Sequence, residues 1–110
     1  MENLKIDYVE FAAPQLEDTQ DFFAKAFGWS FVDYGPDYRD IQNAGTGGGV
    51  ERADTLRAPL IVLKSDDLDA AFEQVKAAGA EITKEIFEFP GGRRFEFKEP
   101  SGTDMAVWST

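Results

Sequence analysis

Hydrophobic and polar positions follow two different periods along the chain, and the change of period recurs. Residues 5–11 alternate as a strand does and end before Pro14, whereas residues 16–27 place apolar side chains at intervals near 3.6 and end at Gly28. A Gly-Pro-Asp turn and a flexible glycine-rich connection then separate shorter apolar runs. The elements predicted in the first half are a strand at 5–11, a helix at 16–27, strands at 29–34 and 38–43, and a short strand near Val50.

The second half repeats this order of elements. The helix beginnings at Leu16 and Leu68 correspond, as do the helix-ending residues Gly28 and Gly79, which favours a duplicated module over two unrelated units. A polar linker at 51–59 is short enough that the halves are expected to pack as one domain over residues 1–110. The second half is predicted to hold strands at 60–64, 81–88, 93–98 and 104–108, and a helix at 68–78 with Asp66 or Asp67 as N-cap; the modules span about 4–52 and 58–109.

The amino-acid composition restricts the chemistry that this chain can perform. Its 110 residues include no histidine and no cysteine, and 21 acidic against 11 basic residues give a net charge of −10. Triads with histidine and imidazole or thiolate metal sites are therefore excluded, so any metal would need oxygen ligands. The negative charge disfavours nucleic acid and membranes as partners and favours a cationic ligand. No apolar run approaches the ~20 residues of a membrane helix, and we expect a cytoplasmic protein.

Three stretches carry a resemblance to a known family. They are Phe-Phe-Ala-Lys-Ala-Phe-Gly-Trp at 22–29, Gly79 at the end of the second helix, and Phe-Lys-Glu-Pro-Ser-Gly at 97–102. With them the chain resembles the vicinal oxygen chelate superfamily of glyoxalase I, bleomycin-resistance proteins and extradiol dioxygenases. The resemblance covers nearly the whole chain. It implies an α+β fold in which two βαβββ modules form an open, incomplete barrel with helices outside and a cavity inside, and it implies a homodimer.

The same resemblance implies metal-ligand positions that this sequence does not fill. Metal-using members take ligands from the first, fifth and eighth strands, and the register places Tyr8, Leu60 and Ala106 there. A fourth ligand of the glyoxalases falls near Glu51. Because Leu60 and Ala106 have no donor atom, we expect no metal, no cofactor, and no glyoxalase or dioxygenase activity that depends on a metal.

Alternation along the strands selects the side chains that are expected to face the cavity. Phe11 is expected to face the helix, Tyr34 or Tyr38 to close the rim of the cavity, and one of Arg93 and Arg94 to point inward. The helical residues Phe22, Phe23, Phe27 and Phe72 are expected to fill the core. The predicted ligand-binding residues are Tyr8, Glu10, Leu60, Val62, Arg94, Glu96, Asp104, Ala106 and Trp108.

Three functions stay open on the sequence alone. The first is a metal-free binding or sequestration protein of the bleomycin-resistance type, with a small organic ligand that is cationic or aromatic. The second is a metal-independent lyase, isomerase or epimerase in which Glu10, Glu96 or Tyr8 acts as acid or base. The third is an oxygen-ligated metalloenzyme of the dioxygenase or glyoxalase group. Its ligands would come from Glu10, Glu51, Glu96 or Asp104. Glu10, Glu96 and Asp104 each also have a simpler role, in which they pair with a neighbouring arginine or lysine or lie in water at the mouth of the cavity.

Overall fold

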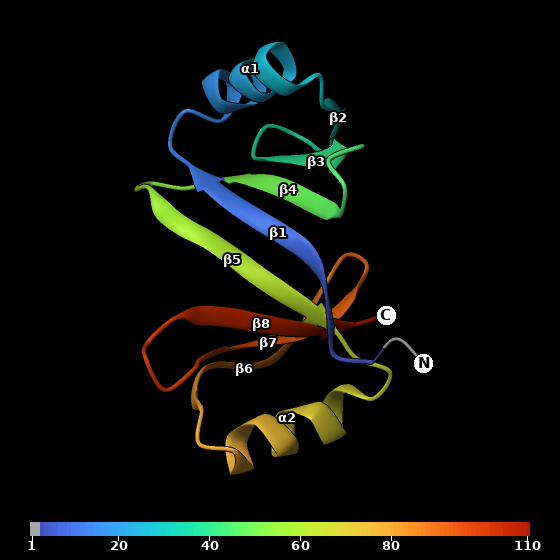
Figure 1. The fold of residues 1–110 in the computed structure, drawn as a ribbon, viewed down its shortest axis with the longest axis vertical. Helices are drawn as coiled ribbons and strands as arrows, with labels where there is room; N and C mark the ends of the chain where they lie inside the picture. Colours follow the sequence, from blue (N-terminus) through green and yellow to red (C-terminus); the bar gives the residue numbers. More distant parts are fainter. Residues whose placement is uncertain (1–2) are drawn as a thin grey trace. The chain divides into compact units, whose positions relative to one another are not determined.

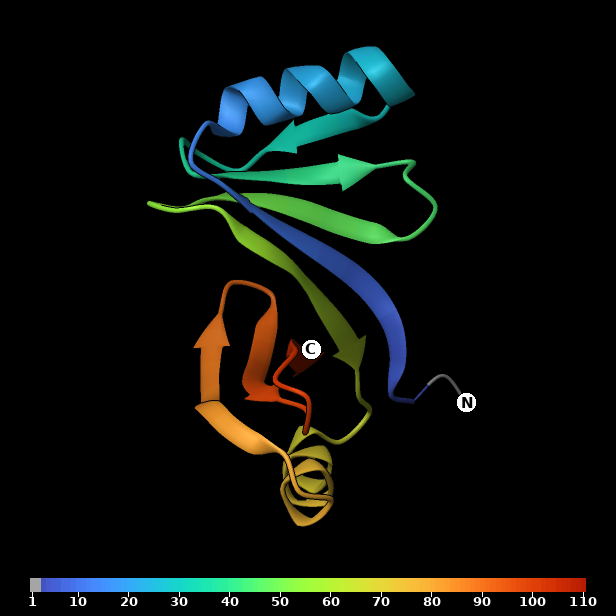
Figure 2. The same cartoon turned by 60° about the vertical axis from the view of Figure 1, so that its left-hand side comes forward.

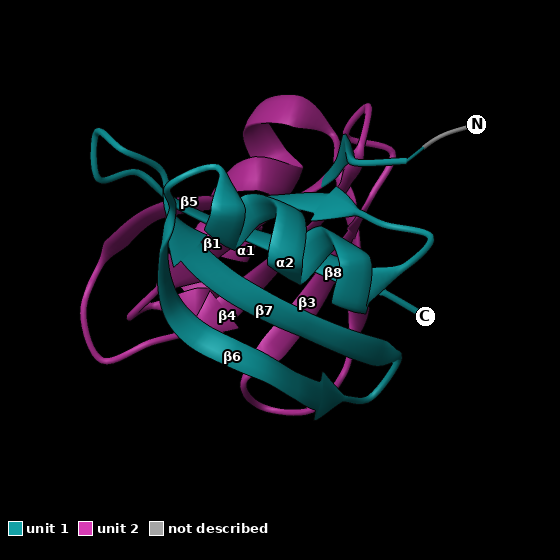
Figure 3. Cartoon of the chain, turned by 90° about the horizontal axis from the view of Figure 1, so that it is seen from below, with its two compact units in different colours: residues 1–7, 61–110 teal, residues 8–60 magenta. Residues whose placement is uncertain are grey.

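The computed structural model describes residues 3–110, and the chain divides into two compact units (Figure 3). The N-terminal unit consists of Tyr8–Leu60, and the C-terminal unit combines Met1–Asp7 with Ile61–Thr110. Strands β1 (Lys5–Ala13) and β5 (Arg57–Lys64) each contribute residues to both units. Among residues 3–110, neither helix is long and apolar enough to cross a membrane.

The N-terminal unit places one helix beside a small sheet. Helix α1 (Leu16–Phe27) follows β1 and lies next to β2 and β3 in both side views (Figures 1 and 2). The strand order is β2-β3-β4-β1, in which β4 runs parallel to β1 and the other pairs are antiparallel. The remaining strands of this unit are β2 (Ser30–Asp33), β3 (Tyr38–Gln42) and β4 (Gly47–Arg52).

The C-terminal unit repeats this arrangement with helix α2 (Leu68–Ala77). Its strand order is β5-β8-β7-β6, again with one parallel pair, β5–β8, and antiparallel pairs otherwise. The predicted α+β class with two βαβββ modules is therefore confirmed. Within the described residues β2 pairs only with β3 and β6 only with β7, so the sheets stay open. The remaining strands are β6 (Glu81–Phe89), β7 (Gly92–Lys98) and β8 (Asp104–Ser109).

Each helix covers one face of its sheet with a separate hydrophobic core. In the N-terminal unit, Phe11 of β1 contacts Phe23 of α1 with ring centroids 5.1 Å apart, on the helix side as expected. In the C-terminal unit, Phe72 of α2 meets Phe95 of β7 edge to face at 5.1 Å. The buried residues are Ala13, Leu16, Ile41 and Val50 in the first core and Leu68, Ala71, Phe95, Phe97 and Val107 in the second.

The expectation that all helical phenylalanines fill the core is wrong for two of them. Phe22 is 60% exposed and Phe27 is 55% exposed. Their rings pack on the outer side of Phe23, at 6.1 and 6.0 Å, and Phe23 itself occupies the space above Phe11. Because one aromatic ring fills the space between helix and sheet, the other two stay outside it.

The glycine-rich stretch and the linker also differ from the sequence prediction. Strand β4 begins at Gly47, so three glycines belong to the strand rather than to a flexible connection. The linker is shorter than expected, because β4 continues to Arg52 and β5 already begins at Arg57. Pro59 lies inside β5, where the ladder to β8 starts only at Ile61, and its missing N–H therefore costs that ladder no hydrogen bond.

The two helices begin differently, and one of them has a side-chain cap. Asp67 caps α2, because its Oδ1 accepts a hydrogen bond from the backbone N–H of Ala70 at 3.1 Å. Gln15 precedes α1 and makes no capping hydrogen bond with its side chain. The other end of α1 is defined by Gly28, whose φ of 76° is the left-handed conformation that glycine adopts readily.

Replacing the cap residue Asp67 with alanine should lower the free energy of unfolding by about 1 kcal/mol, since it leaves a helix N–H unsatisfied. Urea denaturation monitored by circular dichroism measures this change. Asp66→Ala removes an exposed carboxylate one position earlier and should have a smaller effect; an equal loss in both variants would contradict the assignment of the cap.

Candidate functional site

Two partly buried phenols and two carboxylates lie in a row within hydrogen-bonding distance of one another in the N-terminal unit. The hydroxyl oxygens of Tyr8 on β1 and Tyr38 on β3 are 2.6 Å apart, and either can donate to the other. Tyr38 is also placed to donate to Oε2 of Glu10 at 3.1 Å, and Tyr8 to Oδ1 of Asp40 at 3.3 Å. Because each phenol has a single proton, the two phenols supply at most two of these three hydrogen bonds at a time. The resulting order is Glu10, Tyr38, Tyr8, Asp40, and we call these four residues the phenol–carboxylate cluster.

The register of three neighbouring strands brings the cluster together. Gly49 of β4 is paired with Glu10 of β1 on one side and with Asp40 of β3 on the other. Residues paired in this way share one face of a sheet, and positions two residues away along a strand share it as well. Tyr8 and Tyr38 therefore project from the same face as Glu10 and Asp40, which is the face opposite the core.

Gly49 makes room for the two phenols above the middle of the sheet. A Cβ atom at this position would lie 2.0 Å from the hydroxyl oxygen of Tyr38 and 2.3 Å from that of Tyr8. Both distances are far below van der Waals contact, so any other residue would push the hydroxyls away. The missing side chain at position 49 is thus a condition for the contact between Tyr8 and Tyr38.

Burial and the neighbouring carboxylates keep both phenols protonated. The pKa of Tyr38 is raised well above its ordinary value, first by burial and then by the charge of Glu10. Burial also raises the pKa of Tyr8; the hydrogen bond with Tyr38 opposes this effect, and the charges of Asp40 and Glu10 add to it. Each phenol therefore carries one proton at neutral pH, which it can direct toward either of its two neighbours.

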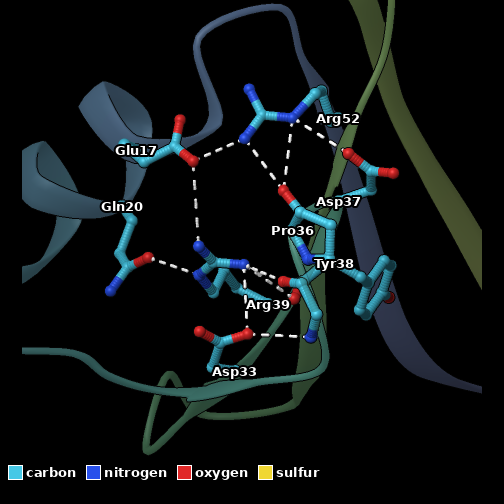
Figure 4. A network of polar contacts seen from close by, with 9 residues as sticks. Glu17, Gln20, Asp33, Pro36, Asp37, Tyr38, Arg39 and Arg52 are labelled. Atoms are coloured by element: carbon cyan, nitrogen blue, oxygen red, sulfur yellow. Dashed lines mark hydrogen bonds and ion pairs between the residues drawn. The ribbon is translucent and has the colours of Figure 1, made fainter.

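A buried arginine holds the strand that carries Tyr38 and Asp40 (Figure 4). On the α1 side of the sheet, Arg39 donates from Nε to Oε1 of Gln20 at 2.9 Å and from Nη1 to the carbonyl of Gly35 at 2.6 Å. Its Nη1 also donates to the carbonyl of Tyr38 at 3.1 Å. These bonds fix the turn before β3 and hence the backbone of the cluster.

Glu17 in the first turn of α1 extends this network to β4. Its carboxylate accepts a hydrogen bond from Nη2 of Arg52 and lies 3.8 Å from Nη2 of Arg39. The Arg52 guanidinium holds the pKa of Glu17 below its usual range. Arg52 in turn donates to the carbonyl of Pro36 at 2.9 Å and pairs with Asp37 at 3.1 Å, so the helix start and the β2–β3 turn are tied together (Figure 4).

The C-terminal unit presents a different surface, in which cations lie over aromatic rings. Nζ of Lys64 is 5.0 Å from the centre of the Trp108 ring, and the Phe89 ring lies 6.2 Å from it. The indole N–H of Trp108 donates to both carboxylate oxygens of Asp7, at 3.1 and 3.2 Å. Trp108 is therefore held in place by a hydrogen bond and by contacts with both of its neighbours.

Arg94 and Glu96 form an ion pair on this same face. Nη2 of Arg94 is 2.8 Å from Oε2 of Glu96, and its guanidinium lies 5.6 Å from the centre of the Phe87 ring. Arg93 points to the other side of the sheet, where it pairs with Asp69 of α2 at 3.6 Å. Of the two arginines, Arg94 is thus the one that faces away from the helix.

The predicted site residues fall into two groups, one in each unit. Tyr8 and Glu10 meet in the phenol–carboxylate cluster, and the buried Leu60 lies in the same unit. Asp104 is largely exposed and pairs with Lys98 at 2.8 Å. By register, Asp104 shares one face of the C-terminal sheet with Val62, Arg94, Glu96, Ala106 and Trp108.

Three residues of these surfaces were not foreseen from the sequence. Asp40 follows Tyr38 by two positions, and strand alternation applied to β3 would have placed both on one face. Asp7, the partner of Trp108, directly precedes Tyr8 on β1, and alternation alone would place the two on opposite sides of the strand. The sequence did not indicate the role of Gly49, because that role depends on where the hydroxyls of Tyr8 and Tyr38 lie in the folded chain.

The residues at the superfamily's metal positions do not fit a divalent ion. The Tyr8 hydroxyl is protonated and hydrogen-bonded within the cluster, and Leu60 and Ala106 are buried without any donor atom. Glu51, near the fourth position, lies 3.3 Å from Arg57. Over the described range 3–110, no three acidic side chains gather in a way that could hold a metal ion.

Comparisons with known proteins agree with this fold. A Mn(II)-bound glyoxalase from Novosphingobium aromaticivorans is 25% identical over 98% of this chain with a TM-score of 0.75, although the chain spans only 39% of that protein. The methylmalonyl-CoA epimerase of Mycobacterium tuberculosis is 13% identical with a TM-score of 0.74, and the match covers 98% of this chain and 89% of the epimerase.

A glyoxalase/bleomycin resistance protein/dioxygenase superfamily member from Vibrio splendidus 12B01 is 15% identical with a TM-score of 0.74. The match covers 97% of this chain and 99% of that protein. At 13% and 15% identity the likeness shows the fold alone. No curated protein matches the sequence. The sequence profile of the Glyoxalase/Bleomycin resistance protein/Dioxygenase superfamily matches residues 5–107, and the chain belongs to that superfamily.

Proposed function

We propose that this chain is a metal-free binding protein of the bleomycin-resistance type and that its ligand is a small organic cation. The observation that carries the proposal is the phenol–carboxylate cluster, in which Glu10 and Asp40 stand at the two ends of a pair of protonated phenols. Binding of this kind needs only charge and hydrogen bonds. It does not need a metal ion, which the residues at the superfamily's metal positions do not fit.

The chemistry of the cluster favours an ammonium group. Glu10 and Asp40 bring two carboxylates to one face of the sheet, and the phenol oxygens add lone pairs between them. An ammonium N–H can donate to any of these oxygens, and a charge-assisted hydrogen bond is about twice as strong as a neutral one. The faces of the tyrosine rings also attract a cation. In the C-terminal unit, the ring of Trp108 provides a second surface for an aromatic ligand.

Benzylamine, which is protonated at neutral pH, should bind more tightly than the neutral benzyl alcohol. Titration followed by backbone amide NMR should shift the signals of Glu10, Asp40 and Gly49. Glu10→Gln and Asp40→Asn should each weaken benzylamine binding about tenfold, which corresponds to the loss of ~1.4 kcal/mol from one charged contact.

Asp54→Asn is the matched control, because it removes one negative charge from an exposed position outside the cluster. It should bind benzylamine as the unaltered chain does. Equal binding of benzylamine and benzyl alcohol, or equal weakening in all three variants, would rule out the cluster as a cation site.

The protonated phenols also predict how stability depends on pH. Below the ordinary tyrosine pKa near 10 the folded and unfolded chains both hold these protons. Above it the unfolded chain loses protons that the folded chain retains, so the free energy of unfolding should fall as the pH rises past about 10. Urea denaturation midpoints measured below and above pH ~10 follow this change. The fall of the midpoint with rising pH should be smaller for Tyr38→Phe than for the unaltered chain. Tyr34→Phe, at a position that is 66% exposed, should keep the original fall, and the same steepness in both variants would refute the assignment.

A second candidate function, acid–base catalysis without a metal, is favoured by the order and the short separations of the same four groups. A proton on Asp40 could pass to the Tyr8 oxygen while the Tyr8 proton moves to Tyr38 and the Tyr38 proton moves to Glu10. The separations of 3.3, 2.6 and 3.1 Å suit both the initial and the final arrangement. Such a chain would let one carboxylate take up a proton as the other releases one.

Solvent deuterium exchange separates the two candidates. Methylmalonyl-CoA is a suitable probe, because its acidic α-hydrogen exchanges when a base removes it and because epimerases of this compound share the fold. The binding proposal predicts no deuterium in the probe beyond the protein-free rate, as measured by mass spectrometry. Exchange that Glu10→Gln abolishes and Asp54→Asn retains would favour the enzyme instead.

A further inference from the structure

Cations and aromatic rings alternate in a row across the C-terminal sheet, on the face that points away from α2. Lys64 of β5 is paired with Trp108 of β8. Arg94 of β7 is paired with Trp108 on one side and with Phe87 of β6 on the other. Nζ of Lys64 lies 5.0 Å from the centre of the Trp108 ring, and the Arg94 guanidinium lies 5.6 Å from that of Phe87. Each ring therefore has a cation within cation–π distance, and we call these four residues the cation–aromatic row.

Lys64 differs from the arginines of the chain in what it contacts. Every arginine between residues 3 and 110 pairs with a carboxylate. Over the same range Lys64 forms no ion pair, although the chain has 21 acidic residues for 11 basic ones, and its ammonium group lies over the Trp108 ring instead. An ammonium group has three N–H donors, so those directed away from the ring can bind the oxygen atoms of an anion.

Trp108 presents a fixed aromatic surface beside this positive charge. Its indole N–H donates to both carboxylate oxygens of Asp7, at 3.1 and 3.2 Å, and this contact sets the orientation of the ring. The Phe89 ring lies 6.2 Å away at an angle of 53°. Both rings are only partly buried. A flat ligand can therefore pack against Trp108 and Phe89 while a group at its edge reaches Lys64.

Cations outnumber carboxylates on the sheet around Trp108. The neighbouring row on the same face consists of Val62, Ala106, Glu96 and Lys84. The two rows together hold three cations and one carboxylate, Glu96, which is already bonded to Arg94 at 2.8 Å. The carboxylate of Asp7, contributed by β1, is engaged by Trp108. The charged residues one row further along are Lys98, Asp104 and Glu81. Lys98 pairs with Asp104 there, so the charge near Trp108 favours an anionic ligand.

We propose that the face around Trp108 is a binding site for an aromatic carboxylate, whose carboxylate pairs with Lys64 and whose ring packs against Trp108 and Phe89. The aromatic surface accepts a flat ligand, and the ammonium group selects a negatively charged one. This site lies in the other unit from the phenol–carboxylate cluster and prefers the opposite charge. It therefore does not depend on the cation binding proposed for that cluster.

Titration with 2-naphthoate, followed by NMR of the indole N–H groups and backbone amides of the full chain, tests the site. The Trp108 indole signal should shift, and 2-naphthoate should bind about tenfold more tightly than the neutral 2-naphthylmethanol. Lys64→Gln should remove this preference by weakening 2-naphthoate alone, and Lys64→Arg should retain it because the charge is kept. Added sodium chloride should weaken 2-naphthoate binding by screening that charge.

Lys76→Gln is the matched control for the loss of a lysine that lies over a ring. Nζ of Lys76 is 6.0 Å from the centre of the Phe72 ring, in the same unit but on α2. This variant should bind 2-naphthoate as the unaltered chain does. Absence of 2-naphthoate binding at millimolar concentration, equal affinity for 2-naphthylmethanol, or equal weakening by Lys64→Gln and Lys76→Gln would overturn the proposal. Shifts confined to the amides of Glu10, Asp40 and Gly49 would also overturn it, because they would place the ligand in the other unit.

Discussion

The candidate site depends on the absence of one side chain. Tyr8 and Tyr38 come from strands on either side of β4, and their hydroxyls meet only because Gly49 leaves the space above that strand empty. The contact then fixes the rest of the cluster, since each phenol has a carboxylate as its second neighbour. A residue whose own chemistry is inert therefore determines where two acids and two phenols meet.

The two units present different surfaces on the same architecture. Both units use one helix, one parallel strand pair and an antiparallel edge to cover one sheet face with apolar side chains. The opposite faces carry no such requirement, and they differ between the units. The N-terminal unit presents phenols and carboxylates, whereas the C-terminal unit presents Trp108 beside Lys64 and the ion pair of Arg94 with Glu96. Packing thus constrains one face of each sheet and leaves the other available for function.

The fold was predictable from the sequence because each element depends on local patterns. Helix α1 was predicted residue for residue, and most strand limits differ by only a few positions, since apolar periodicity and turn residues determine them. Of the cluster, Tyr8 and Glu10 were predicted by alternation. Asp40 and Gly49 were missed, because their roles arise from the register between strands. The exposure of Phe22 and Phe27 was also missed, since periodicity alone cannot show that Phe23 already fills the core.

Neutron diffraction from a deuterated crystal would test the cluster most directly, because it locates the hydrogen positions on which the account depends. The account predicts a deuteron on each of the two phenol oxygens and one of them between the oxygens of Tyr8 and Tyr38, over an unobstructed Gly49. A phenol oxygen without a deuteron, or two phenols that bind water instead of each other, would contradict it.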